Sequence, residues 1–312
     1  MGVLCAVLGV AAVFLAKPRW LATTLARQKE AAPTDRVERE ENMARGATPR
    51  DQASGGDPLY AKHCAVCHGT LGDGLGQAAR YLFPRPRDFG AGGLQMASTD
   101  NGVASLEDIE RVLARGIPGT SMQAFDALST SERRQLAQEV FRLRREAVHR
   151  QVASELRQAG EEPVEVEVRE AVERITTPGR PVALPDVWSL GERAVSRGRA
   201  VYRTLGCDQC HGDDGMGAPD RPLFDAQGEP NRARDLVHEP FKGGRERESI
   251  YLRIVVGMPG TAHPAAPKLP EDELKDLVEY VLSLARQPQR RLTNHDRRTY
   301  AAPRAYRERF GQ

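Results

Sequence analysis

The chain has 312 residues, 45 lysines and arginines against 43 aspartates and glutamates, and an aromatic content of 5%. This length is enough for two domains of ordinary size, and a net charge of +2 excludes functions that depend on strong attraction to nucleic acid or acidic membranes. Few aromatic residues and no long alternating runs of β-branched residues argue against a large all-β core, so we expect an all-α protein.

The chain begins with an apolar run of 14 residues, residues 3–16. This run is short for a membrane-spanning helix but fits the hydrophobic part of an export signal. No basic segment precedes it, and Lys17 and Arg19 follow it. We therefore expect a signal or N-terminal membrane anchor over residues 1–28, with a buried core helix as the alternative, and a linker over residues 29–56.

Four of the five cysteines fall in two copies of one pattern, Cys-x-x-Cys-His. The copies CAVCH and CDQCH comprise Cys64, Cys67 and His68, and Cys207, Cys210 and His211. This is the attachment pattern of a c-type haem: two thiols form thioethers with one macrocycle, and the histidine ligates the iron. A redox-active cysteine pair would need a thioredoxin-like βαβ context, and a zinc site would join ligands roughly 140 residues apart. Haem attachment is therefore the favoured interpretation.

Each motif is followed by the pattern of a long loop, a helix, a glycine-rich loop and a final helix. In the first copy, Ser105 and Asp108 make a capping box, and Gly116 stands where a C-cap glycine belongs. Ser129 and Glu132 open the next helix in the same way. In the second copy, the final helix is predicted over residues 270–285 from an apolar stripe of Leu274, Leu277, Val278, Val281 and Leu282.

Residues 149–190 are charged and then rich in proline. Their alternating VEVEV stretch could form a short strand, but a strand without a partner is marginally stable. We interpret this segment as a surface connector, part helical and part extended. It separates a first domain at residues 57–148 from a second at residues 191–287, and residues 288–312 are expected to be a solvated C-terminal tail.

The two domains are copies of one unit. Three blocks match in order, although small insertions and deletions shift the offset between blocks. These blocks pair residues 60–76 with 202–217, 85–89 with 232–236, and 105–122 with 247–263.

A CxxCHG motif followed by a Gly-Pro-Gly-Thr-x-Met loop and a final amphipathic helix resembles class I cytochrome c, here in tandem. The resemblance covers roughly residues 57–145 and 195–287. It implies the all-α cytochrome c fold, two covalently bound haem c groups, attachment in the periplasm and one-electron transfer. It also implies that a proline carbonyl orients each proximal histidine, for which the candidates are Pro84, Pro86, Pro219 and Pro222.

In that family, the loop methionine ligates the iron opposite the histidine. The matching residue in the first loop, GIPGTSM, is Met122, with Met96 as the fallback. In the second loop, GMPGTAH, the aligned residue is His263, which we favour as the sixth ligand. Met258 in the same loop is the alternative ligand. The non-functional alternative is that His263 faces solvent and does not ligate the iron.

Four arginines and two aspartates also recur in both copies. An arginine can pair with a haem carboxylate or simply face water, and the aspartates are expected to hold a loop by accepting from backbone amides. These residues are Arg85, Arg87, Arg232 and Arg234, with Asp88 and Asp235.

The sequence thus predicts a periplasmic electron-transfer protein, held at the cytoplasmic membrane by its N-terminal segment. A thioether ligand raises the reduction potential of iron and a second imidazole does not. The second haem is therefore predicted to have the lower potential, so electrons would enter there and leave from the first. A quinol-oxidising complex or a dehydrogenase on one side, and an oxidase or a small cytochrome on the other, are the expected partners.

Two alternatives stay open. A dihaem cytochrome c peroxidase also joins two unlike haem units, but in that family the N-terminal haem has the two histidines. Here the first unit lacks a fitting second histidine, which argues against the enzyme. A haem-based sensor is the other alternative, in which a weak sixth ligand gives way to a diatomic gas.

Overall fold

The computed structural model describes residues 56–218, 220–285 and 289–311, all within a unit that spans residues 49–312. The predicted signal or anchor at residues 1–28 and almost all of the predicted linker lie outside the described residues. In the described part of the chain, no helix is both long enough and apolar enough to cross a membrane.

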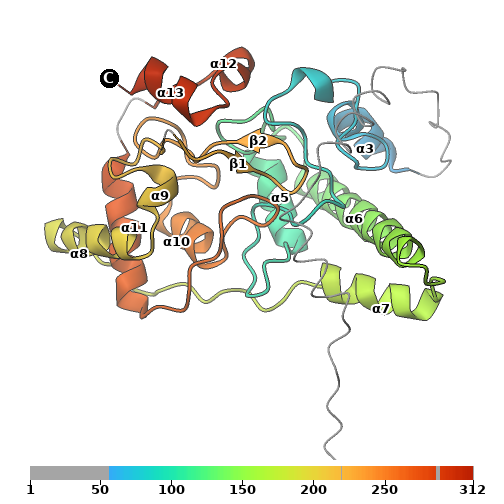
Figure 1. Cartoon of the computed structure of the whole chain (residues 1–312). Coiled ribbons are helices and arrows are strands. Elements are labelled where there is room, and N and C mark those ends of the chain that lie inside the picture. Colours follow the sequence, from blue (N-terminus) through green and yellow to red (C-terminus); the bar gives the residue numbers. More distant parts are fainter. Residues whose placement is uncertain (1–55, 219, 286–288, 312) are drawn as a thin grey trace, which may run out of the picture. The chain divides into compact units, whose positions relative to one another are not determined.

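The first half contains five α-helices and one short 3-10 helix among its described residues (Figure 1). They are α3 (Pro58–His63), α4 (Ala65–His68), η1 (Ala79–Tyr81), α5 (Leu106–Arg115), α6 (Thr130–Gln158) and α7 (Glu165–Thr176).

The second half repeats the order of α3 to α6 and adds two helices at its end (Figure 1). Its elements are α8 (Glu192–Thr204), α9 (Asp208–His211), β1 (Leu223–Phe224), β2 (Pro230–Asn231), α10 (Arg247–Val255), α11 (Glu271–Leu284), α12 (Asn294–Thr299) and α13 (Pro303–Phe310). The two strands form an antiparallel pair with Leu223 opposite Asn231. The described residues are thus almost entirely helical in their regular structure, as the sequence predicts.

Both predicted capping boxes are confirmed. At α5, Ser105 Oγ accepts from the Asp108 amide at 3.2 Å, and Asp108 Oδ2 accepts from the Ser105 amide at 3.0 Å. Ser129 and Glu132 make the same exchange at the start of α6. Each box satisfies backbone donors that a helix start otherwise leaves unpaired. The start of each helix is therefore fixed by its own sequence.

Each half has a core of its own. In the first, α5 and α6 pack against each other and α3 packs on α6. In the second, α11 packs against both α8 and α10. The predicted stripe of α11 is confirmed, since Leu277 and Val278 are 1% and 0% exposed. Two separate clusters follow from the two copies of one amphipathic pattern.

The predicted connector is more regular than expected. Helix α6 continues past residue 148 to Gln158, and the VEVEV stretch opens α7 rather than forming a strand. The physical reason lies just after the alternating residues, where Val168, Ala171 and Val172 share one helical face and are buried. α7 packs this face against α6, which outweighs the local alternation.

The end of the chain also differs from expectation, because residues 289–311 fold back onto the protein. Asn294 Oδ1 accepts from the Phe83 amide at 2.7 Å, and Arg297 Nε donates to the Phe83 carbonyl at 2.7 Å. Tyr306 is 1% exposed and donates its hydroxyl to Asp235 Oδ2 at 2.8 Å. We call residues 289–311 the C-terminal clasp, because they bind both halves. The arginines and the two tyrosines of this segment follow no periodic pattern, so the sequence does not indicate that the segment packs on the rest of the protein.

Candidate functional site

The two Cys-x-x-Cys-His motifs adopt the same local structure. The first cysteine of each, Cys64 or Cys207, is the N-cap of a four-residue helix that ends at the motif histidine. A tyrosine from the preceding helix holds the following glycine: Tyr60 Oη donates to the Gly69 carbonyl at 2.9 Å, and Tyr202 Oη donates to the Gly212 carbonyl at 2.8 Å. The two motifs thus share the short helix and the tyrosine bond, and they differ in φ at the first cysteine, −119° at Cys64 and −61° at Cys207.

Each motif histidine is oriented by one backbone carbonyl. His68 Nδ1 lies 3.0 Å from the Arg87 carbonyl oxygen, and His211 Nδ1 lies 3.0 Å from the Arg234 carbonyl oxygen. A carbonyl only accepts, so Nδ1 carries the proton and Nε2 keeps its lone pair for a metal. Metal-ligating histidines typically make such a bond through their second nitrogen.

The expected proline carbonyls are therefore wrong, and arginine carbonyls take that role. The register of the loop explains it. The Phe89 amide donates to the Gly72 carbonyl and the Leu236 amide donates to the Gly215 carbonyl, both at 2.8 Å. These two bonds fix the position of the carbonyl two residues earlier in each copy.

Burial sets the protonation of both motifs. It lowers the pKa of His68 and of His211, so both imidazoles are neutral, which metal ligation requires. It raises the pKa of Cys64 to about 12 and that of Cys207 to about 11. Thiols with such a high pKa stay protonated, whereas a zinc site or a reactive redox pair requires thiolates. No group of three or more metal-binding side chains occurs among the described residues.

The two glycine-rich loops match bond for bond. The Thr120 hydroxyl donates to the Ile117 carbonyl at 2.7 Å, and Thr120 Oγ1 accepts from the Met122 amide at 3.1 Å. In the second loop, Thr261 makes the same bonds to Met258 and His263 at the same distances. Met122 and His263 therefore occupy equivalent positions, and Met258 is equivalent to the apolar Ile117.

His263 faces the motif histidine of its own half. The ring centroids of His211 and His263 are 6.1 Å apart, and the rings are inclined by 65°. That separation accommodates one metal ion between two ring nitrogens, because each metal–nitrogen bond is about 2.0–2.1 Å long. Burial, together with His211 and Arg253, lowers the pKa of His263 to about 4. Its Nδ1 is buried without a hydrogen-bond partner, unlike the Nδ1 of His211.

In the first half, Met122 is partly buried and packs against the cluster that contains Tyr60, Cys64 and Leu113. The His68 ring stacks on Phe89, with centroids 4.9 Å apart. The fallback Met96 lies elsewhere, because its sulfur accepts from Arg253 Nη1 of the second half at 3.5 Å. The structure thus places Met122, rather than Met96, on the loop that corresponds to His263.

A cavity of about 590 Å³ lies between His211 and the second loop. Cys207, Cys210, His211, Met258 and His263 all line it. So do six cationic side chains and one carboxylate, Arg221, Arg232, Arg234, Lys242, Arg253, Arg297 and Glu239.

These residues fit a haem. The cavity is lined by Cys207, Cys210 and His211, by a second imidazole at His263, and by an excess of positive charge that could face two carboxylates. Burial lowers the pKa of Lys242 to about 7, and Arg253 Nε is buried without a partner. Buried cations of this kind are costly unless an anion faces them.

The sequence alone did not indicate Lys242 and Arg253 as site residues. Lys242 Nζ donates to Gln95 Oε1 at 3.3 Å, and Arg253 Nη1 donates to the Gln95 carbonyl at 2.8 Å. Both donors belong to the second half and both acceptors to the first. Neither residue has an equivalent lysine or arginine in the first copy, so comparison of the two copies does not reveal it. Their contacts with Gln95 of the first half and their place in the cavity identify them.

The predicted role of the two repeated aspartates is confirmed. Asp88 Oδ1 accepts from the Gly90 amide at 2.8 Å, and Asp235 Oδ1 accepts from the amides of Val237 and His238 at 2.9 Å. Each aspartate therefore shapes the loop directly after its histidine-orienting arginine carbonyl.

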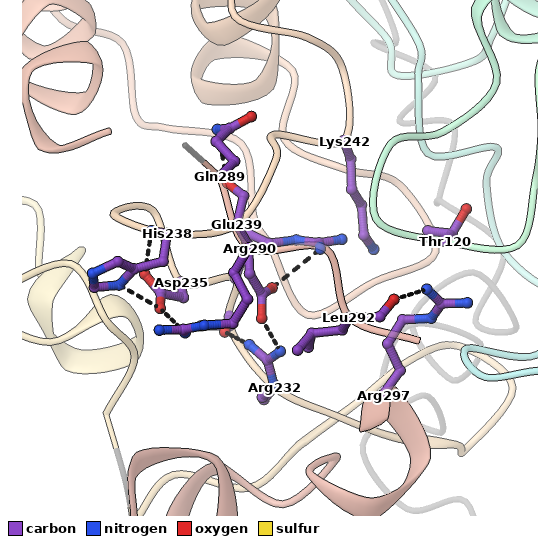
Figure 2. A network of polar contacts seen from close by, with 12 residues as sticks. Thr120, Arg232, Asp235, His238, Glu239, Lys242, Gln289, Arg290, Leu292 and Arg297 are labelled. Carbon is purple, nitrogen blue, oxygen red and sulfur yellow. Dashed lines mark hydrogen bonds and ion pairs between the residues drawn. The ribbon is translucent and has the colours of Figure 1, made fainter. Parts of the chain in front are cut away.

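Asp235 and Glu239 also collect the charges behind the second motif. Asp235 Oδ2 lies 3.1 Å from His238 Nδ1 and 3.3 Å from Arg290 Nη1 of the C-terminal clasp. Glu239 pairs with Arg232 (Figure 2), and it also pairs with Arg234 Nη1 at 3.1 Å. The network holds in place the segment whose carbonyl orients His211.

Comparison with known proteins agrees with this geometry. Residues 195–285 match the family described as cytochrome c, and residues 51–138 match the family of subunit III of cbb3-type cytochrome c oxidase. The chain is a tandem of two cytochrome c domains. The match over residues 51–138 defines cytochrome domain 1, and the match over residues 195–285 defines cytochrome domain 2.

A solved structure resembles most of this tandem cytochrome. It is a chain from the reducing HAO-like protein complex of Kuenenia stuttgartiensis, with 29% sequence identity and a TM-score of 0.59, and the match covers 73% of this chain and 94% of that chain. No curated protein matches the chain. Cytochrome c domains carry covalently bound haem c and transfer electrons, so haem-based electron transfer is the general function of this protein.

Proposed function

We propose that this tandem cytochrome binds two haem c groups and carries single electrons between redox proteins. His68 and Met122 would ligate the iron of domain 1, and His211 and His263 that of domain 2. The observation that carries the proposal is the bond-for-bond match of the two loops, which places Met122 and His263 in the same position. The 6.1 Å between the rings of His211 and His263 supports the second pair.

The residues of the chain have separate tasks. Cys64 and Cys67 would hold one haem through thioether bonds to its vinyl groups, and Cys207 and Cys210 would hold the other in the same way. The carbonyls of Arg87 and Arg234 fix the ring orientation and the free nitrogen of the proximal histidines. When bound, haem c supplies an iron that gains or loses one electron reversibly.

The unlike sixth ligands give the proposal a direction. Methionine raises the potential of an iron site relative to a second histidine. Electrons therefore enter at domain 2 and leave from domain 1, taken from one redox protein and given to another. Domain 1 is similar to an oxidase subunit, and most of the chain is similar to one chain of a protein complex, which supports redox proteins as partners. A quinol-oxidising complex or dehydrogenase, and an oxidase or small cytochrome, remain the proposed types.

We also propose that the protein works in the periplasm and that its N-terminal segment tethers it to the cytoplasmic membrane. The apolar run at residues 3–16 and the export-dependent chemistry of haem c attachment support this location. Fractionation of cells that express the full chain, with a salt and detergent wash of the membranes, tests it.

The central experiment is expression in a host that matures c-type cytochromes. The purified protein should be red, contain two irons per chain, and have the mass of the polypeptide plus two haems. A redox titration should resolve two one-electron steps, the lower of which belongs to domain 2. A colourless protein at the polypeptide mass would refute the proposal, and turnover of hydrogen peroxide would favour the peroxidase alternative instead.

A further inference from the structure

Arg87 and Arg234 occupy equivalent positions in the two cytochrome domains, within the matched blocks 85–89 and 232–236. The backbone carbonyl of each orients the proximal histidine of its own domain. Their side chains run in the opposite direction, toward the other domain. Each residue thus touches two sites at once.

The side chain of Arg87 reaches the sixth-ligand loop of domain 2. Its Nη1 donates to the Gly260 carbonyl at 3.1 Å, and Gly260 lies three residues before His263. The same carbonyl accepts from the Ala226 amide at 3.1 Å within domain 2. The Nε of Arg87 is buried without a hydrogen-bond partner. The guanidinium of Arg87 is therefore enclosed between the two domains rather than exposed to solvent.

The side chain of Arg234 makes the reciprocal approach to domain 1. A Cβ added to Gly119 would lie 2.4 Å from Arg234 Nη1, so the guanidinium lies directly against that glycine. Gly119 is the equivalent of Gly260, and it lies three residues before Met122. Gly119 also lines the cavity that holds His211 and His263. Glu239 fixes the guanidinium of Arg234 from behind at 3.1 Å.

We infer that Arg87 and Arg234 are positioning residues that couple the two haem sites in a crossed manner. Each orients the proximal histidine of its own domain through its carbonyl. Each also contacts the sixth-ligand loop of the other domain with its guanidinium, Arg87 by a hydrogen bond to Gly260 and Arg234 by close packing against Gly119. A change at one residue therefore reaches both irons. The inference rests on the proposed function, because it requires a haem in each domain.

The charge of each guanidinium has a second consequence. Burial lowers the pKa of both arginines, yet a guanidinium stays charged in proteins. A buried positive charge is poorly screened and disfavours the more positive, oxidised iron. Each arginine is thus expected to raise the reduction potential of both sites. It acts on the site of the other domain through the contact of its guanidinium with the sixth-ligand loop there.

Arg87→Gln and Arg234→Gln, purified with haem attached, test this coupling. Two quantities are measured: the two midpoint potentials, and the rate at which cyanide abolishes the near-infrared methionine–iron band of domain 1. Arg234→Gln should lower both potentials and make loss of the methionine band several-fold faster. Arg87→Gln should lower both potentials, but change the signal of the two-histidine site and leave the methionine band at its original rate.

Two further variants make the result specific. Arg134→Gln removes an exposed charge that pairs with Glu110 within domain 1, and it should change neither potential. Arg87→Lys and Arg234→Lys keep the charge without the forked donor, so both should keep potentials close to the original ones. Arg234→Lys should still lose the methionine band faster, and Arg87→Lys should still change the signal of the two-histidine site. They also serve if a glutamine variant does not fold.

The outcomes separate the two proposals. Potentials that shift only in the domain that carries the substitution, or a methionine band that responds to Arg87→Gln and not to Arg234→Gln, would overturn the crossed coupling while two haems remain attached. A protein without haem refutes the proposed function itself.

Discussion

The two cytochrome domains share the backbone of their sixth-ligand loops but not the side chain at its most important position. Thr120 and Thr261 make the same hydrogen bonds, and the two loop glycines have nearly the same φ, +72° at Gly119 and +75° at Gly260. Met122 and His263 then stand at equivalent places. The glycines and the threonine determine the loop, so the residue at this position can differ without a change of backbone. Under the proposed ligation, the two domains therefore differ in their iron ligand while they share one fold.

Exchange of the two ligands should give the largest effect. His263→Met makes domain 2 a His/Met site and should raise its potential close to that of domain 1, while Met122→His should lower domain 1 toward domain 2. A spectroelectrochemical titration measures both potentials, and the methionine–iron band should double in the first variant and vanish in the second. Potentials that stay unlike after His263→Met would show that the cavity, not the ligand, makes the domains differ.

Removal of the imidazole sharpens the choice between His263 and Met258. Because the Nδ1 of His263 has no hydrogen-bond partner, we expect it to be the weaker of the two histidine ligands. His263→Ala should open one coordination position, so that the reduced protein binds carbon monoxide at one haem of two. Difference spectra measure this, and Met258→Leu is the matched control that should remain closed. A new methionine–iron band in His263→Ala would instead show that Met258 can reach the iron.

The two equivalent glycines should respond unequally to alanine. Both have a positive φ, which costs a non-glycine residue about 1–2 kcal/mol. At Gly260 a Cβ would also lie 2.5 Å from the backbone oxygen of Gly93, whereas at Gly119 it meets the side-chain end of Arg234. Gly260→Ala should therefore lower the free energy of unfolding more than Gly119→Ala, by about 1–3 kcal/mol. Denaturant unfolding of the haem-loaded variants measures the difference, and equal losses would contradict it.

The smallest effect concerns the C-terminal clasp, which has no match in domain 1. Tyr306→Phe removes the bonds of the hydroxyl to Asp235 and Arg290, at 2.8 and 2.7 Å, without a change of ring packing. We expect a loss of about 1 kcal/mol in the free energy of unfolding. Tyr300→Phe, at a more exposed tyrosine of the same segment, is the control and should cost less.

Much of this architecture follows from local sequence signals. The capping boxes at Ser105 and Ser129 and the apolar stripe of α11 act within a few residues, so the sequence alone predicts them. The repeat predicts the equivalence of Met122 and His263, because insertions between blocks do not disturb the loop itself. The ligand roles stay predictions until the haem-loaded protein is measured.

What the sequence could not provide depends on contacts between distant residues. The buried face of α7 can be recognised only from its packing against α6, and the role of Arg87 only from its hydrogen bond to the Gly260 carbonyl. The same applies to Lys242 of the second half, whose side chain donates to Gln95 of the first. Such contacts have no period and no local signature, and so they appear only in three dimensions.

The C-terminal clasp has a consequence for biogenesis. A chain is synthesised from its N-terminus, so both attachment motifs emerge before Asn294 and Tyr306, which contact Phe83 and Asp235. Cofactor attachment can therefore take place while these contacts are still unmade. An Arg297→Ala variant, which loses a bond to the Phe83 carbonyl, should accordingly retain full haem content by absorbance. The clasp would then form in a closing step after maturation and hold together two domains that already carry their haems.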